Sequence, residues 1–329
     1  MNEQTLPEAE AGAEPVTQDA WRDTLRALGE AEGFYEDLGA EHTALFVERG
    51  KTLIVTFENL DHVFDRGADR MPWGYGFAEA HGWSMLGMMA HSWTWYRDED
   101  VIAFFDRLRE EGFFERFEKV VFYGASMGGY AAAAYSAAAP GATVICISPQ
   151  ATLRREDTAW ETRYRGAWRR DFSGRYGYAP ASVATAGPVH IFYDPRAPLD
   201  AMHAALFRSP NVTRYRCRFM GHRIASLWLQ MGLLKPVVEA CVDGSLTRHG
   251  FYAMMRARRD NPRYQREMLE RLEDIGRPWL TKTYCSAVLE RRKGPRFRRA
   301  LRGANIALKK ATARAGTAKR TRTPKEAGS

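Results

Sequence analysis

The sequence has few cysteines and no long apolar run. Only 4 of its 329 residues are cysteine, and they lie far apart with no Cys-x-x-Cys pair. We therefore expect neither disulfides nor a structural zinc site. Apolar stretches such as Ala131 to Ala139 are shorter than the roughly 20 residues that cross a bilayer, so no transmembrane segment is expected either. The cysteines are Cys146, Cys217, Cys241 and Cys285.

Several motifs that mark cofactor or targeting functions are also missing. The chain has no Gly-x-x-x-x-Gly-Lys-Ser/Thr phosphate loop, no His-Glu-x-x-His zinc site and no Gly-x-Gly-x-x-Gly that opens a helix. We therefore expect no cofactor and no catalytic metal. Residues 1–18 hold four glutamates, no Lys or Arg and no apolar core, which does not fit a secretory signal. The sequence predicts an acidic, disordered leader over residues 1–18 and a cytoplasmic location.

The charge of the chain is divided unevenly, with an excess of acidic residues before Leu246 and a large excess of basic residues after it. The whole chain has a net charge of +8. Residues 246–329 carry 23 Lys and Arg against 7 Asp and Glu, a net charge of +16, which leaves −8 for the residues before Leu246. Such a basic segment predicts an anionic surface as its partner, whether membrane, nucleic acid or acidic polymer. The alternative is a solvated, Arg-rich helical extension. No base-reading motif is present, so specific nucleic-acid binding is not expected.

Short apolar runs rich in β-branched and aromatic residues alternate with helical patterns before residue 240. This alternation predicts a three-layer α/β fold, in which helices cover both faces of a mostly parallel sheet. The expected helices of the sheet region include 19–33, 98–111 and 128–139. The expected strands are 43–47, 52–57, 84–89, 119–123, 143–147, 189–193 and 212–217.

The organisation of the chain follows from these patterns. Residues 19–245 are expected to form the α/β domain, with an insertion at about 152–188 in which aromatic residues and arginines are interleaved. The insertion is either a lid that contacts the substrate or a helical excursion that only packs on the body. Residues 246–311 predict a basic helical extension. Residues 312–329 cannot bury enough apolar area to order themselves, so a disordered basic tail is expected there.

The sharpest motif is Gly124-Ala125-Ser126-Met127-Gly128, which joins an apolar strand to an alanine-rich helix. A serine on such a sharp strand-to-helix turn has strained backbone angles, so the residues two before and two after it must lack bulk. The helix that begins after the serine points its free N–H groups toward the site, where a negative oxygen would develop. The motif therefore predicts Ser126 as a nucleophile.

In this motif and its context the chain resembles the α/β-hydrolase family, and more narrowly its members whose turn reads Gly-x-Ser-Met-Gly-Gly-Tyr. The resemblance covers about residues 43–240. It implies a serine nucleophile, an acid after a late strand and a histidine after the last strand, in that chain order. It also implies an enzyme that forms an acyl-enzyme intermediate.

Candidates for the other two residues lie where the resemblance implies them. His222 follows the last expected strand and is preceded by Gly221. Two acids, Asp194 and Asp200, follow the strand 189–193. We favour Asp200, because the family usually places its acid farther into this loop, and keep Asp194 as the alternative acid. Asp200 could instead serve as the N-cap of the helix that follows it. His203, one turn after Asp200, could support the site or contact the substrate, but we expect it on the surface of that helix.

An oxyanion hole needs two N–H donors near the carbonyl oxygen of the substrate. The backbone N–H of Met127, directly after the nucleophile, is the first candidate. The second should follow the strand 52–57, which points to Asn59 or Glu58. The sequence there lacks the His-Gly-Gly-Gly pattern of many lipases and esterases, so the second donor is left open. The aromatic run from His91 to Tyr96 either lines the pocket or packs in the core.

Together these features predict a serine hydrolase that cleaves an ester or related acyl bond through Ser126, Asp200 and His222. The substrate would be a small-molecule or glycan-linked acyl compound. Acyl transfer to another acceptor uses the same residues, so an acyltransferase is one alternative. A non-catalytic protein that keeps the hydrolase fold and docks an anionic partner through its basic tail is the other.

Overall fold

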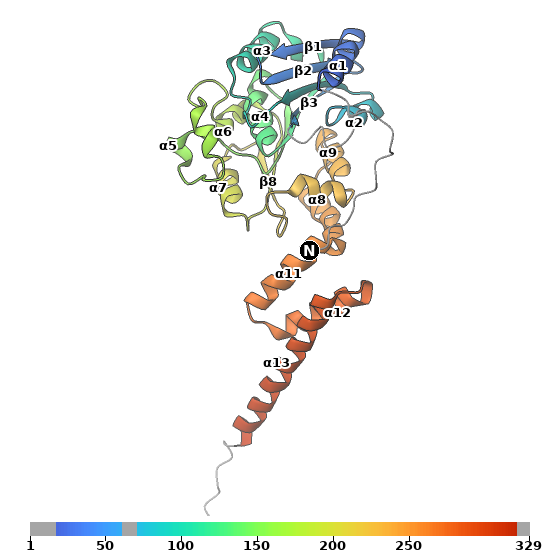
Figure 1. The fold of residues 1–329 in the computed structure, drawn as a ribbon, viewed down its shortest axis with the longest axis vertical. Helices are drawn as coiled ribbons and strands as arrows, with labels where there is room; N and C mark the ends of the chain where they lie inside the picture. The colour runs from blue at the N-terminus through green and yellow to red at the C-terminus, as the bar shows by residue number, and fades with distance from the viewer. Residues whose placement is uncertain (1–17, 61–70, 321–329) are drawn as a thin grey trace, which may run out of the picture. The chain divides into compact units, whose positions relative to one another are not determined.

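Figure 1 shows the fold in a computed structural model that describes residues 18–60 and 71–320. The chain divides into two compact units, the first ending at Ala253 and the second beginning at Met254. This division lies a short way beyond the boundary at residue 246 that the charge pattern suggested. Residues 1–17, which make up nearly all of the expected acidic leader, lie outside the described residues.

The first unit is built on one mixed sheet. Within the described residues it has eight strands in the order β1-β2-β4-β3-β5-β6-β7-β8. β2 runs antiparallel to both β1 and β4, and every other neighbouring pair is parallel. This order and these directions are those of the α/β-hydrolase fold, which confirms the predicted fold class. The strands are β1 (Gly33–Leu38), β2 (His42–Val47), β3 (Thr52–Asn59), β4 (Ser84–Ala90), β5 (Lys119–Ala125), β6 (Thr143–Ile147), β7 (Val189–Tyr193) and β8 (Val212–Arg216).

Helices cover both faces of this sheet because successive side chains of each strand point to opposite faces. In β2, Phe46 packs in the main core, to which α3 and α4 contribute, whereas its neighbours Leu45 and Val47 pack against Trp21 and Leu25 of α1. Every residue of β2 is therefore buried. The helices are α1 (Gln18–Glu32), α2 (Tyr75–Ala80), α3 (Glu99–Glu110), α4 (Met127–Tyr135), α7 (Pro198–Leu206), α8 (Ile224–Gln230), α9 (Leu234–Val242) and α10 (Arg248–Met254).

The insertion between β6 and β7 consists of short helical turns, α5 (Arg155–Thr158), η5 (Arg165–Arg169), α6 (Ala179–Ser182) and η6 (Val183–Thr185). It is fastened to the body by hydrogen bonds. The buried Arg97 donates to the carbonyls of Asp171 and Arg175, at 2.8 Å each. The hydroxyl of Tyr130 donates to the carbonyl of Tyr176 at 2.8 Å. The insertion is thus held in place over the sheet by buried groups of the body.

The second unit is helical, with η7 (Met255–Asp260), α11 (Pro262–Asp274), α12 (Pro278–Arg291) and α13 (Pro295–Arg320). A small core of Leu269, Cys285, Val288 and Phe297 joins its three α-helices. The anionic partner expected for this basic segment stays a prediction. In the ranges that the structure describes, no helix combines the length and the apolar character that crossing a bilayer requires.

One boundary in this unit differs from the expectation. The helix predicted to end at Ala311 continues to Arg320, so the disordered tail expected over residues 312–329 does not begin at Thr312. Alanine, arginine and lysine are strong helix formers, and adding a residue to an existing helix costs far less than starting one. A helix that already exists can therefore extend through a segment that has too few apolar residues to form a core. Residues 321–329 lie outside the described part of the chain.

Candidate active site

Ser126 sits at the turn between β5 and α4 in a conformation that non-glycine residues rarely adopt. Its φ is 54° and its ψ is −119°. Such backbone angles persist only where the surrounding structure fixes them. Here the Ser126 N–H donates to the carbonyl of Ile147 at 2.8 Å, and the Ser126 carbonyl accepts the N–H of Tyr130 at 3.0 Å. The result is a partly exposed serine at the carboxyl ends of the central strands.

The two glycines that flank the serine are required by close backbone contacts. A Cβ atom at Gly124 would collide with the carbonyl of Gly128, and one at Gly128 would collide with the carbonyl of Phe57 in β3. Neither carbonyl can move without shifting β3 or α4. The small residues of the motif thus allow the first turn of α4 to lie against the end of β3 and β5.

The structure brings Ser126, His222 and Asp200 together in one hydrogen-bonded chain. The Ser126 Oγ lies 2.8 Å from His222 Nε2. On the other side of the ring, His222 Nδ1 lies 3.0 Å and 2.9 Å from the two carboxylate oxygens of Asp200. Because Nδ1 faces only acceptors in this pair, it carries the proton, and Nε2 is left as an acceptor for the serine hydroxyl. This is the geometry of a nucleophile, a base and an orienting acid.

The two acids after β7 have different surroundings. Asp200 lies in the first turn of α7, whose N-cap is Ala197, so Asp200 does not cap the helix. Its carboxylate faces His222 instead. Asp194 binds backbone groups instead, accepting the N–H of Arg196 at 2.9 Å, of Met220 at 2.7 Å and of Gly221 at 2.8 Å. Asp194 therefore holds the turn that carries His222, while Asp200 contacts the imidazole itself.

A second pair of charged side chains, contributed by the insertion, lies behind Asp200. Arg163 donates through Nη1 to Asp200 at 2.7 Å and through Nη2 to Glu161 at 2.6 Å. Burial alone would raise the pKa of Asp200, but hydrogen bonds from His222 and Arg163 lower it below its ordinary value. Asp200 is only 1% exposed, so these partners keep a buried carboxylate ionised beside the imidazole.

Glu161 is anchored in turn by His203. The Ala151 N–H donates to His203 Nδ1 at 3.1 Å, so this nitrogen carries no proton, and Nε2–H donates to Glu161 at 3.0 Å. His203 is therefore a neutral, buried imidazole, and burial lowers its pKa. The expectation that His203 lies on the helix surface is wrong, because that side of α7 is covered by Trp160 and Glu161 of the insertion.

The expected oxyanion donors lie at the same edge of the sheet as Ser126. Met127 is the first residue of α4, and the first N–H groups of a helix have no partner within the helix. Asn59 ends β3, in register with Ala90 of β4. The carbonyl of Glu58 accepts a hydrogen bond from the buried Tyr96 hydroxyl at 2.7 Å. The roles of Met127 and Asn59 as oxyanion donors stay predictions.

Aromatic side chains from two segments lie near the serine and histidine. The Trp95 N–H donates to the sulfur of Met127 at 3.1 Å, and its indole N–H donates to Gln150 at 3.1 Å. Tyr164 of the insertion packs on Trp95 with ring centroids 5.0 Å apart, and Trp93 lies 6.3 Å from Tyr164 in a stacked orientation. Trp93 is 50% exposed, whereas Trp95 is buried. The run 91–96 thus contributes both to the core and to the surface beside the serine.

Sequence reasoning did not single out Glu161, Arg163 and Tyr164. The signal that was available is the mixture of arginines and aromatic residues in the insertion, which suggested a lid without indicating its contacts. Local patterns could not identify these residues, because their partners lie in α7 and in the turn before α8.

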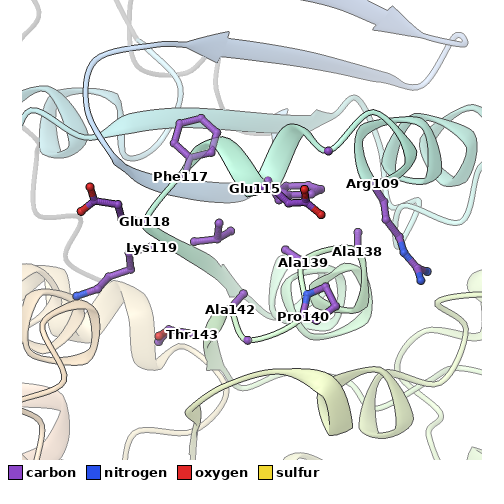
Figure 2. Close-up of a pocket in the computed structure, with 14 residues that line it drawn as sticks. Arg109, Glu115, Phe117, Glu118, Lys119, Ala138, Ala139, Pro140, Ala142 and Thr143 are labelled. Atoms are coloured by element: carbon purple, nitrogen blue, oxygen red, sulfur yellow. The ribbon is translucent and has the colours of Figure 1, made fainter.

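A separate pocket of about 690 Å³ lies at the amino ends of the central strands (Figure 2). Its lining includes Lys119 and Thr143, which begin β5 and β6, together with Arg109 of α3. Ser126 follows the opposite, carboxyl end of β5. This pocket is therefore distinct from the site around the serine.

No protein-family model matches the sequence, and no curated protein matches it either. Solved structures with a similar fold include the capsule O-acetyltransferase of Neisseria meningitidis serogroup A, with 13% identity, 62% of this chain and 93% of that chain covered, and a TM-score of 0.43. An esterase of Pyrococcus furiosus is 12% identical over 64% of this chain and 89% of its own, with a TM-score of 0.38. An acylaminoacyl peptidase of Pyrococcus horikoshii is 11% identical over 64% of this chain and 41% of its own, with a TM-score of 0.38.

The buried Glu161 makes a prediction about acid stability. Burial raises its pKa, but hydrogen bonds from His203 and Arg163 outweigh this and lower it from 4.5 to about 2. A carboxylate with a lowered pKa stabilises the fold above its ordinary pKa, and this stability is lost as pH falls from about 4.5 toward 2. We expect Glu161→Gln to lower the free energy of unfolding by about 3 kcal/mol at pH 7, because it removes one member of a buried charge network.

Urea unfolding followed between pH 7 and pH 3 tests this prediction. The difference in the free energy of unfolding between the wild type and Glu161→Gln should narrow as the pH falls below about 4.5. Glu156→Gln, at an exposed glutamate of the same insertion, is the matched control and should follow the wild type throughout. A constant difference at every pH would show that the Glu161 charge does not contribute to stability.

Proposed function

We propose that the protein is a serine hydrolase that cleaves an ester or related acyl bond through an acyl-enzyme on Ser126. The single observation that supports this most is the hydrogen-bonded chain from Ser126 Oγ through His222 to Asp200. A hydroxyl is a weak nucleophile unless an adjacent base accepts its proton. The buried Asp200, held by Arg163, orients the ring so that Nε2 faces the serine.

The proposed reaction has two steps. In the first, Ser126 Oγ attacks the acyl carbon while His222 Nε2 takes the hydroxyl proton; the ester C–O bond then breaks, and the departing oxygen takes that proton from Nε2. In the second, His222 accepts a proton from water, whose oxygen attacks the acyl carbon, and Ser126 regains its proton as the acyl group leaves. Asp200 stays ionised throughout and stabilises the imidazolium form.

The negative oxygen of each tetrahedral intermediate needs donors. We assign the first to the backbone N–H of Met127, where the positive end of the α4 dipole adds to the hydrogen bond. The second is assigned to Asn59, at the end of the neighbouring strand β3. Transfer of the acyl group to an alcohol instead of water uses the same groups, so an acyltransferase is the alternative within this proposal.

The proposed substrate is a small-molecule or glycan-linked acyl compound. Support comes from Trp93, which is 50% exposed and stacks near Tyr164, the tyrosine whose hydroxyl lies 3.3 Å from His222 Nε2. Ligand sites commonly combine aromatic walls with a few polar groups that fix orientation. Arg163 and His222 provide polar groups next to these rings.

Labelling with a fluorophosphonate probe tests the proposed function, because such probes react with serines that an adjacent base activates. We expect the purified wild-type protein to label and Ser126→Ala to remain unlabelled. Ser148→Ala provides a control at a second serine with a positive φ, and this variant should label as the wild type does. A folded wild-type protein that does not label would reject the proposal and favour a non-catalytic binding protein.

A further inference from the structure

A second hydroxyl reaches the catalytic face of His222. The Tyr164 Oη lies 3.3 Å from His222 Nε2, the same nitrogen that faces Ser126 Oγ at 2.8 Å. Tyr164 belongs to the insertion, between the short helical turns α5 and η5. Two oxygens from unrelated parts of the chain therefore converge on the one nitrogen that must exchange protons during the reaction.

Proton transfer restricts where the departing oxygen of a substrate can lie. An oxygen that takes a proton from Nε2 must lie about 2.6–3.2 Å from it. Ser126 Oγ lies within this range, at 2.8 Å, and Tyr164 Oη lies just outside it, at 3.3 Å. A departing oxygen that approaches Nε2 therefore comes within reach of the Tyr164 hydroxyl. The water or alcohol that attacks the acyl-enzyme must approach the same nitrogen, so it meets the same hydroxyl.

We propose that Tyr164 is a catalytic residue on the leaving-group side, where its hydroxyl donates a hydrogen bond to the oxygen that exchanges a proton with His222. This inference rests on the proposed function. As the ester C–O bond breaks, its electron pair passes to the departing oxygen, which takes the proton from His222 Nε2. Tyr164 keeps its own proton throughout and stabilises the charge that develops on this oxygen before the proton arrives.

The surroundings of Tyr164 fit a fixed donor. Its ring packs on Trp95, with centroids 5.0 Å apart, which limits rotation of the side chain. The preceding residue, Arg163, is held by its hydrogen bonds to Glu161 and Asp200, so the backbone at Tyr164 is tied to the same carboxylate that orients His222. Burial raises the pKa of Tyr164, so its hydroxyl remains protonated and able to donate near neutral pH.

This arrangement also gives the insertion a role. The body of the fold supplies the serine, the acid and the histidine, and the insertion supplies the group next to the departing oxygen. Substrates with stable leaving anions need little help there, whereas those that release an alcohol need a donor as well as a proton. The proposal therefore concerns which acyl compounds the enzyme can cleave.

The test compares two acetate esters of similar size, 4-nitrophenyl acetate, which releases a stable phenolate, and 4-nitrobenzyl acetate, which releases an alcohol. Tyr164→Phe removes the hydroxyl and keeps the ring. We expect its kcat/KM to fall about tenfold further, relative to the wild type, for the benzyl ester than for the phenyl ester. Tyr178→Phe, at an exposed tyrosine of the same insertion, should change neither value.

The outcomes separate this inference from the proposed function. If Tyr164→Phe labels with the fluorophosphonate probe and loses activity equally on both esters, or on neither, the role of Tyr164 is wrong and the serine hydrolase stands. If the wild type neither labels nor cleaves either ester, the proposed function fails and the role of Tyr164 falls with it. Near-ultraviolet circular dichroism of each variant shows that a selective loss does not arise from unfolding.

Discussion

His222→Ala is expected to lower kcat/KM for ester cleavage by about a million-fold, the size of loss that follows when a residue of such a unit is removed. The reason lies in the geometry of the ring. Nε2 is 2.8 Å from Ser126 Oγ and is the group that takes the hydroxyl proton. Without it, the serine has no base during attack and the departing oxygen has no acid. Steady-state kinetics with 4-nitrophenyl acetate measure the loss.

Two further measurements make this expectation specific to the base. His249→Ala changes an exposed histidine on α10 and should leave kcat/KM unchanged. Added imidazole should partly restore activity to His222→Ala, because a free base can enter the space that the ring vacates, and it should not restore Ser126→Ala. If His222→Ala retains activity within tenfold of the wild type, His222 is not the base.

Much of the fold could be predicted from the sequence because the central strands are buried on both faces. The runs 143–147 and 189–193 coincide with β6 and β7, and five further predicted strands match observed ones to within two residues at either end. Continuous apolar runs of this kind are typical of parallel strands inside a sheet. The turn at Ser126 could also be predicted. Close backbone contacts leave no room for a Cβ atom at Gly124 or Gly128, and this requirement appears in the sequence as a glycine on each side of the serine.

The edge strand β1 and the contacts of Arg163 could not be predicted from the sequence, because they depend on contacts with other segments of the chain. β1 (Gly33–Leu38) is an edge strand with only one buried residue, so it lacks an apolar run. Its pairing with β2 decides its structure. The contacts of Arg163 join a residue of the insertion to Asp200, far along the chain. Such contacts follow from how β6, β7 and the insertion are arranged in space, and no local sequence pattern specifies that arrangement.

The sequence also left two acids open, and Asp200→Asn is expected to distinguish them. We expect kcat to fall about 10⁴-fold with the protein still folded. An asparagine amide can donate to His222 Nδ1, which then gives up its proton to Nε2. Nε2 would carry a proton and could no longer accept one from Ser126. The variant should also label more slowly with the fluorophosphonate probe.

Asp194→Asn serves as the matched comparison, because it makes the same chemical change at the other acid that follows β7. Its carboxylate accepts three backbone N–H groups from two segments, and an amide nitrogen facing any of them would leave a donor unsatisfied. We expect a loss of about 2 kcal/mol in the free energy of unfolding, with kcat reduced far less than in Asp200→Asn. Urea unfolding and kcat measured on both variants decide the assignment. A large loss of kcat in Asp194→Asn with unchanged stability, and a small one in Asp200→Asn, would make Asp194 the acid.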